Sequence, residues 1–143
     1  MSVSSRRQLL TKISELNNLQ DKLEAQQANL EDIVRRLSNI GSTLVALDEL
    51  AKRKKSKFEG FIALGSDVFI RGKIEVDKEK ILQEIGAGVS LSLNLEKTQT
   101  RLEKRREDLR DKINQKQGQL SEIVKRIQKL RSEIRNLRQQ IQY

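Results

Sequence analysis

Cysteine and histidine are both absent from this chain of 143 residues. Their absence excludes disulfide bridges, thiolate zinc sites and nucleophilic chemistry based on either side chain. The segment Gly86–Gly88 (GAG) lacks the lysine and the helix context of a nucleotide-binding loop. We therefore expect no catalytic residues, no metal site, no cofactor and no enzymatic activity.

Aromatic residues are also scarce, at 3% of the chain, and proline and tryptophan are missing. Compact cores usually depend on aromatic side chains for bulk. Here the apolar residues are mainly leucine and isoleucine, dispersed among charged residues that make up 34% of the chain. This composition is typical of long helices or a coiled coil.

Long hydrophobic runs do not occur either. The N-terminal segment has no apolar stretch of signal-peptide length, and no segment approaches the roughly 20 apolar residues of a membrane span. We expect a soluble protein of the cytoplasm that does not enter a membrane.

Positive charge is in excess, with a net charge of +9. Basic proteins attract nucleic acids or acidic partner surfaces, although a long helical pair can carry such an excess on a solvated surface. The segment 52–57 has five cations in six residues, which suit a helix C-terminus but also resemble a nuclear-import or nucleic-acid motif. A second basic series would either attract an acidic surface or form a solvated helix face, and comprises Lys125, Arg126, Lys129, Arg131, Arg135 and Arg138.

Leucine recurs every seven residues from Leu9 to Leu44, and Ala51 continues the series. Further leucines and isoleucines lie at the matching three-residue offset, which predicts a coiled-coil helix over residues 4–56. A similar pattern predicts a second helix over residues 95–142, with Gly118 in its interior. Antiparallel pairing sets Leu9 opposite Leu137 and Leu44 opposite Leu102, and only Leu30 meets a polar residue, Lys116.

Between the helices, residues 58–93 contain four short apolar stretches separated by turn residues. We predict strands over 58–64, 68–74, 81–85 and 89–93, paired as two β-hairpins. Gly65, Gly86 and Gly88 supply the positive φ angles that the turns need, and Asn94 is placed to cap the second helix.

Two hairpins are too small to fold alone in water, and their edges require further strands. We therefore expect hairpins from several chains to assemble into a shared β body. The predicted assembly residues are Phe61, Ile62, Val68, Phe69, Ile70, Ile74, Ile81, Ile85, Val89, Leu91 and Leu93.

The stretch IALGSDVFIRGKIEVDKEKILQEIGAGVSLSLNLEKTQTRLEKRREDL, residues 62–109, resembles the alpha class of the prefoldin family. It has a strand ending in Leu-Gly, a strand carrying Gly-Lys, a strand ending in Gly-x-Gly, and a capped helix. The resemblance implies an α+β fold, mainly α, in which a long antiparallel two-helix coiled coil carries two central β-hairpins that form a β-barrel body in an oligomer. One prefoldin-like domain would span residues 1–143.

The same resemblance implies a molecular chaperone that works without ATP. Such a subunit would join beta-class prefoldin subunits in a hetero-hexamer, bind unfolded polypeptides between its arms and deliver them to a group II chaperonin. Helix ends fray and expose side chains, so we predict client binding at the free end of the arms. The predicted client-binding residues are Leu9, Leu10, Ile13, Ile134, Leu137 and Ile141.

Two other functions fit parts of the pattern. A basic coiled-coil nucleic-acid-binding protein would explain the charge but not the hairpins, and the aromatic platforms that bind single strands are missing. A homo-oligomeric structural relative of prefoldin would have the same fold without a beta-class partner.

Overall fold

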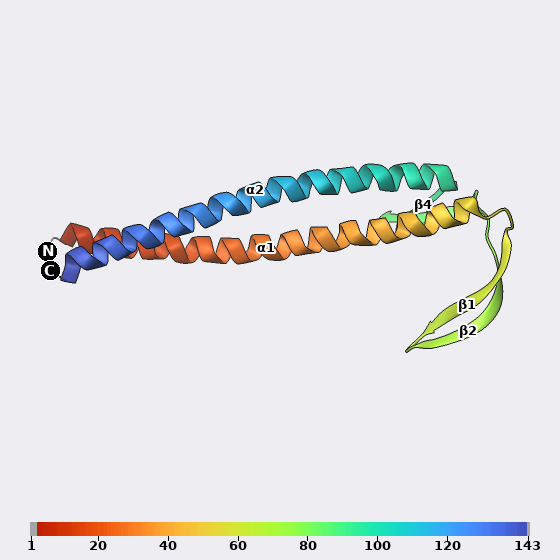
Figure 1. The fold of residues 1–143 in the computed structure, drawn as a ribbon, viewed down its shortest axis with the longest axis horizontal. Coiled ribbons are helices and arrows are strands. Elements are labelled where there is room, and N and C mark those ends of the chain that lie inside the picture. The colour runs from red at the N-terminus through yellow and green to blue at the C-terminus, as the bar shows by residue number, and fades with distance from the viewer. Residues whose placement is uncertain (1–2, 143) are drawn as a thin grey trace. The chain divides into compact units, whose positions relative to one another are not determined.

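The computed structural model describes residues 3–142, which form two long helices separated by four strands (Figure 1). Helix α1 spans Val3–Lys52 and helix α2 spans Leu95–Gln142. Between them lie β1 (Lys57–Gly65), β2 (Val68–Glu75), β3 (Ile81–Gly86) and β4 (Val89–Leu93). The fold is mainly helical with two small antiparallel hairpins, as the sequence predicted.

Helix α1 ends at Lys52, four residues before the predicted end at residue 56. The difference has a local cause, because the segment that follows carries consecutive cations that repel one another when wound into a helix. Arg53 instead lies over the ring of Phe58, with its guanidinium carbon 4.7 Å from the ring centre. The short connection therefore leads directly into β1.

The chain forms two compact units. The arm unit comprises the described residues 3–37 and 108–142, and the hairpin unit comprises residues 38–107. The prediction of one domain over residues 1–143 stays a prediction.

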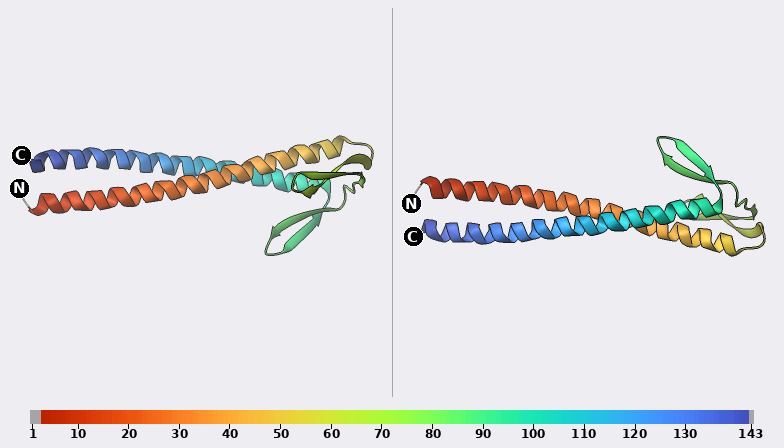
Figure 2. Two further views of the ribbon diagram at one scale, coloured as in Figure 1. Left: turned by 90° about the horizontal axis from the view of Figure 1, so that it is seen from below. Right: turned by 90° about the horizontal axis from the view of Figure 1, so that it is seen from above.

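In the arm unit, the first part of α1 and the last part of α2 lie side by side in all views (Figures 1 and 2). They run antiparallel, since Lys12 contacts Glu133 and Gln26 contacts Lys116. Four buried apolar side chains of α2 recur at intervals of four, three and four, as the heptad pattern predicted: Ile123, Ile127, Leu130 and Ile134. Leu109, two heptads before Ile123, and Ile33 of α1 are also buried.

Lys116 and Gln26 form a polar contact within this seam. Lys116 interrupts the apolar series of α2, and its ammonium donates a hydrogen bond to the side-chain oxygen of Gln26 at 3.4 Å. Both side chains are half-buried, whereas the neighbouring Gln27 faces solvent. The sequence predicted that Lys116 would lie opposite Leu30. In the structure, Lys116 also contacts Gln26 across the two helices, and this contact forms the polar layer.

The hairpin unit contains two separate two-stranded sheets, with β1 paired to β2 and β3 paired to β4. Gly65, Gly86 and Gly88 all have positive φ angles, of 102°, 114° and 74°, which confirms their predicted role in the turns. The turns also place Ser66, Asp67 and Ala87 at positive φ.

Asn94 caps α2 as predicted. Its side-chain oxygen accepts a hydrogen bond from the backbone N–H of Lys97 at 2.8 Å, and its carbonyl accepts from Thr98. The connection before it centres on Lys78, whose carbonyl accepts from the N–H of Leu95 at 2.8 Å. The Lys78 ammonium donates to the carbonyl of Arg53 at 2.6 Å, so one residue links the start of α2 to the end of α1.

Gly118 lies in the interior of α2 with nothing within 4 Å of an added Cβ atom. We expect Gly118→Ala to stabilise the chain by about 1 kcal/mol, because alanine restricts the unfolded backbone and favours the helix. Thermal unfolding followed by circular dichroism measures the effect as a higher midpoint. Gly86→Ala is the matched control: it is equally free of neighbours, but its φ of 114° should make the same substitution destabilising. A lower midpoint for Gly118→Ala would contradict the packing described here.

The polar layer gives a second prediction. Replacing both Gln26 and Lys116 with leucine should complete the apolar seam and raise the unfolding midpoint, since polar residues in a coiled-coil core reduce its stability. Gln27→Leu, one residue away on the solvent side, should leave the midpoint nearly unchanged. Equal shifts for the double variant and the Gln27 control would show that Gln26 does not lie in the seam.

Candidate assembly and client-binding surfaces

The β1–β2 hairpin has one apolar face. Antiparallel pairing sets Phe58 opposite Ile74 and Ile62 opposite Ile70, and residues two apart in a strand share a face. Ile62 and Ile70 are about half exposed in the chain by itself. The hairpin therefore presents an apolar surface that its own two strands do not cover.

Two glycines make this face close-fitting. A Cβ atom on Gly72 would lie 3.3 Å from the Ile62 Cδ1 methyl, and one on Gly60 would lie 3.4 Å from the Ile74 Cδ1 methyl. Each isoleucine therefore packs diagonally over a glycine of the partner strand. Larger residues at these two positions would push the isoleucines out of the face.

The opposite face of the same hairpin is mixed. Glu59 pairs with Lys73 across the strands, and Glu59 also forms an ion pair with Arg71. Phe61 and Phe69 lie among these charges and are 70% and 60% exposed. One face is thus purely apolar, and the other combines aromatic and charged side chains.

The β3–β4 hairpin is also two-sided. Ile81, Leu91 and Leu93 share its more buried face with Gln83, whose side-chain oxygen accepts a hydrogen bond from Arg101 of α2 at 3.2 Å. Leu82 points the other way and is 75% exposed. This hairpin is therefore partly covered within its own chain.

Most of the predicted assembly residues are exposed in the isolated chain. Ile74, Ile81, Leu91 and Leu93 are half-buried, and the others are exposed: Phe61, Ile62, Val68, Phe69, Ile70, Ile85 and Val89. The sequence reasoning missed Leu64 and Leu82, which are just as exposed. Their positions inside apolar strands were the signal that could have identified them.

The predicted client-binding residues differ in exposure. Leu10 is 67% exposed, whereas Ile134 is buried at 5%. Leu9, Ile13, Leu137 and Ile141 are half-buried along the seam. Leu10 is thus the one member of this set that offers most of its side chain without any opening of the helices, and Ile134 belongs to the core of the seam.

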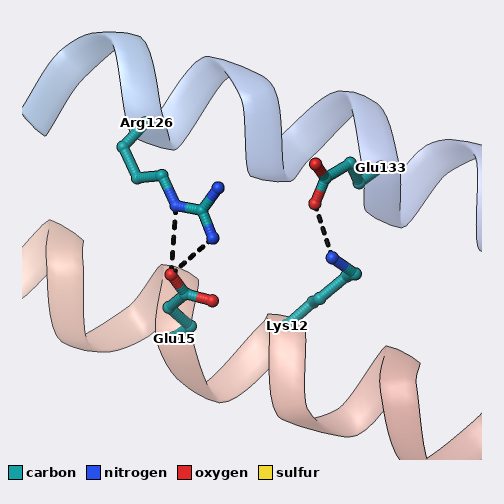
Figure 3. A network of polar contacts seen from close by, with 4 residues as sticks. All are labelled: Lys12, Glu15, Arg126 and Glu133. Atoms are coloured by element: carbon teal, nitrogen blue, oxygen red, sulfur yellow. Dashed lines mark hydrogen bonds and ion pairs between the residues drawn. The ribbon is translucent and has the colours of Figure 1, made fainter.

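Two ion pairs join the helices of the arm unit (Figure 3). The Lys12 ammonium lies 2.6 Å from a Glu133 carboxylate oxygen. The Arg126 guanidinium donates from both Nε and an Nη atom to one Glu15 oxygen, at 3.1 Å and 2.8 Å. Partly exposed pairs of this kind contribute little stability but fix which side chains face one another.

These contacts change the proton affinities of two groups. The hydrogen bond from Lys12 holds the pKa of Glu133 below its ordinary value, with the nearby positive charges adding to the effect. The hydrogen bond to Glu15 raises the pKa of Arg126. Glu133 therefore remains ionised, and paired, into the acid range.

Within residues 3–142, no cluster of acidic side chains is placed to bind a metal ion. Neither helix in that range has an apolar stretch long enough to cross a bilayer. The features available for function are thus apolar strand faces, exposed apolar groups along the helices, and positive charge.

Comparison with known proteins identifies the class of this fold. The family model described as "Prefoldin subunit" matches residues 19–142. The chain therefore belongs to the prefoldin family, which is a family of chaperones rather than enzymes.

The curated relatives support the alpha class. The chain is 28% identical to prefoldin subunit alpha of Pyrococcus horikoshii over 109 residues, covering 76% of this chain and 73% of the relative. It is 24% identical to prefoldin subunit alpha of Thermofilum pendens over 131 residues, covering 92% and 98%. Prefoldin subunit alpha 2 of Thermococcus kodakarensis is 32% identical over 91 residues, covering 59% and 63%.

A solved structure shares the fold. A chain of the filamentous PFD from Methanocaldococcus jannaschii superposes with a TM-score of 0.67, covering 82% of this chain and 96% of that one, at 17% identity. At that identity the likeness concerns the fold alone.

The ion pair between Lys12 and Glu133 makes stability depend on pH. The folded state lowers the pKa of Glu133 from the ordinary glutamate value of 4.5, so the pair stabilises the arms fully at pH values above 4.5. This stabilisation is lost as the pH falls through the lowered pKa. The difference in unfolding midpoint between the unmodified protein and Glu133→Gln should be largest at neutral pH and shrink in acid. Glu31→Gln, at an exposed position on α1, is the control for the loss of one carboxylate charge. A difference that does not vary with pH would rule out this role for Glu133.

Proposed function

We propose that this chain is the alpha-class subunit of a cytoplasmic, ATP-independent chaperone. It assembles with beta-class prefoldin subunits into a hetero-hexamer, binds unfolded polypeptides at the free ends of its arms, and passes them to a group II chaperonin. The observation that carries this proposal is the pair of two-stranded hairpins with uncovered apolar faces, in a chain of the prefoldin family.

Assembly through the hairpins follows from the properties of small sheets. A two-stranded sheet is only marginally stable in water, and its outer edges have backbone groups free to pair. Within residues 3–142, each strand pairs with a single neighbour, so every strand retains an open edge. Strands from other subunits would satisfy these edges and cover the face formed by Phe58, Ile62, Ile70 and Ile74.

Client binding follows from the apolar groups at the arm ends. A chaperone of this kind needs apolar surface that clients can reach without causing the chaperone itself to aggregate. Leu10 supports this role through its exposure, and Leu9, Ile13, Leu137 and Ile141 would become accessible when the terminal helical turns open. Several arms acting on one client would multiply weak contacts through effective concentration. Buried Ile134 would contribute only after wider opening of the helices.

Light scattering tests the assembly. The mass of the purified chain should reach about six subunits only when a beta-class prefoldin subunit is added. A large assembly formed by this chain alone would instead identify the homo-oligomeric relative. A monomer or dimer under both conditions would show that the hairpins do not mediate assembly.

Suppression of client aggregation tests the arm ends in the same complex. Leu10→Ser should raise the concentration needed for half-maximal protection by about fivefold, because each arm loses the burial of one leucine side chain against the client. Val45→Ser is the matched control, since Val45 is 63% exposed on the same helix but lies in the hairpin unit. Equal effects of the two substitutions, at unchanged mass, would remove the support for binding at the arm ends.

A further inference from the structure

A shallow groove with a volume of about 580 Å³ lies between the helices of the arm unit. Its apolar part comes from Ile13 and Leu16 of α1 and Ile134 of α2. Its α2 rim consists of Arg131, Arg135 and Arg138. We call this feature the arginine groove.

The three arginines form one row. Their spacing of four and then three residues places them on the same side of α2, along about 10 Å of the helix axis. All three are exposed, and within residues 3–142 none of them lies within ion-pair distance of a carboxylate. The row therefore presents three guanidinium groups that have no acidic partner in the described chain.

The acids of this region face away from the groove. Taking buried Leu130 as the centre of the seam, Arg131 is rotated by about 100° to one side of α2 and Glu133 by about 60° to the other. Glu133 and Glu15 are both engaged in the ion pairs described above, with Lys12 and Arg126. The two flanks of the seam thus differ: one is neutralised by ion pairs between the helices, and the other remains positive.

Other basic residues of the arm ends add to the positive electrostatic potential of the groove. Residues 3–20 and 122–142 contain nine Lys and Arg residues against three Glu residues. Such an excess attracts negative charge over the Debye length, and guanidinium groups can add paired hydrogen bonds to carboxylates. An apolar floor beside three arginines fits an apolar side chain that is flanked by carboxylates.

We propose that the arginine groove makes these arms select acidic client segments, in which an aliphatic or aromatic residue is flanked by Asp or Glu. The row of arginines matches about three residues of extended chain, so two carboxylates near one apolar anchor would suffice. This inference rests on the proposed function and specifies the class of polypeptide that the arms prefer. A nucleic acid would match the charge but would leave the apolar floor of Ile13, Leu16 and Ile134 unused.

Fluorescence anisotropy with the purified chain in its assembly tests the inference. Two labelled peptides of equal length share one leucine, flanked by Asp and Glu in the first and by Asn and Gln in the second. The acidic peptide should bind about tenfold more tightly at low salt, the effect expected of one charge-assisted hydrogen-bond pair. Its advantage should decrease as salt is added.

Variants locate the effect. Replacing Arg131, Arg135 and Arg138 with glutamine should bring the acidic peptide down to the affinity of the neutral one and leave the neutral peptide unchanged. Replacing the same three with lysine keeps the charge and should retain most of the preference for the acidic peptide. This second variant keeps the test decisive if the glutamine variant fails to assemble. The matched control replaces Lys104, Arg105 and Arg110 with glutamine, removing equal charge from exposed positions elsewhere on α2.

The outcomes separate this inference from the proposed function. Equal affinity for both peptides, or equal loss in the control variant, would overturn the selectivity of the arginine groove. If the neutral peptide still binds in that case, client binding at the arms stands. Failure to bind either peptide would instead count against the proposed function. A single-stranded oligonucleotide that displaces the acidic peptide at equal concentration would show a general polyanion surface and overturn the peptide assignment.

Discussion

A pair of helices can bury only the stripe along which the two helices meet, and this limit governs the whole chain. All the buried apolar side chains among residues 3–142 belong to α1 or α2, and none belongs to a strand. The hairpin strands are richer in apolar residues than the helices but have no third layer to cover them. What the chain leaves exposed is therefore a consequence of its architecture, and in the assembly proposed above, strands of other chains would cover it.

Much of this arrangement follows from short-range sequence patterns. Heptad spacing identifies the seam, the glycines at 65, 86 and 88 identify the turns, and Asn94 identifies the start of α2. Each of these signals operates over a few residues, where backbone geometry restricts the choices strongly. The end of α1 was harder to predict, because a cationic run can either extend a helix end or terminate it.

Contacts between distant residues were not predictable in the same way. Lys12 and Glu133 are both ordinary surface residues in the sequence, and their pairing depends on the register and rotation of two helices. The same applies to Gln26 and Gln27, of which only the first enters the seam. The arginine groove was predictable only in part. The basic series of α2 is evident in the sequence, but its position beside Ile13 and Leu16 depends on how the two helices pack.

The antiparallel path of the arm unit has a practical consequence for anyone handling this protein. The start of α1 and the end of α2 lie at the same end of that unit (Figure 2). An affinity tag, dye or fusion partner attached at either terminus would therefore sit beside the same pair of helix ends. The two-residue turn at Ser66 and Asp67, in the hairpin unit, offers an attachment point remote in sequence from both termini.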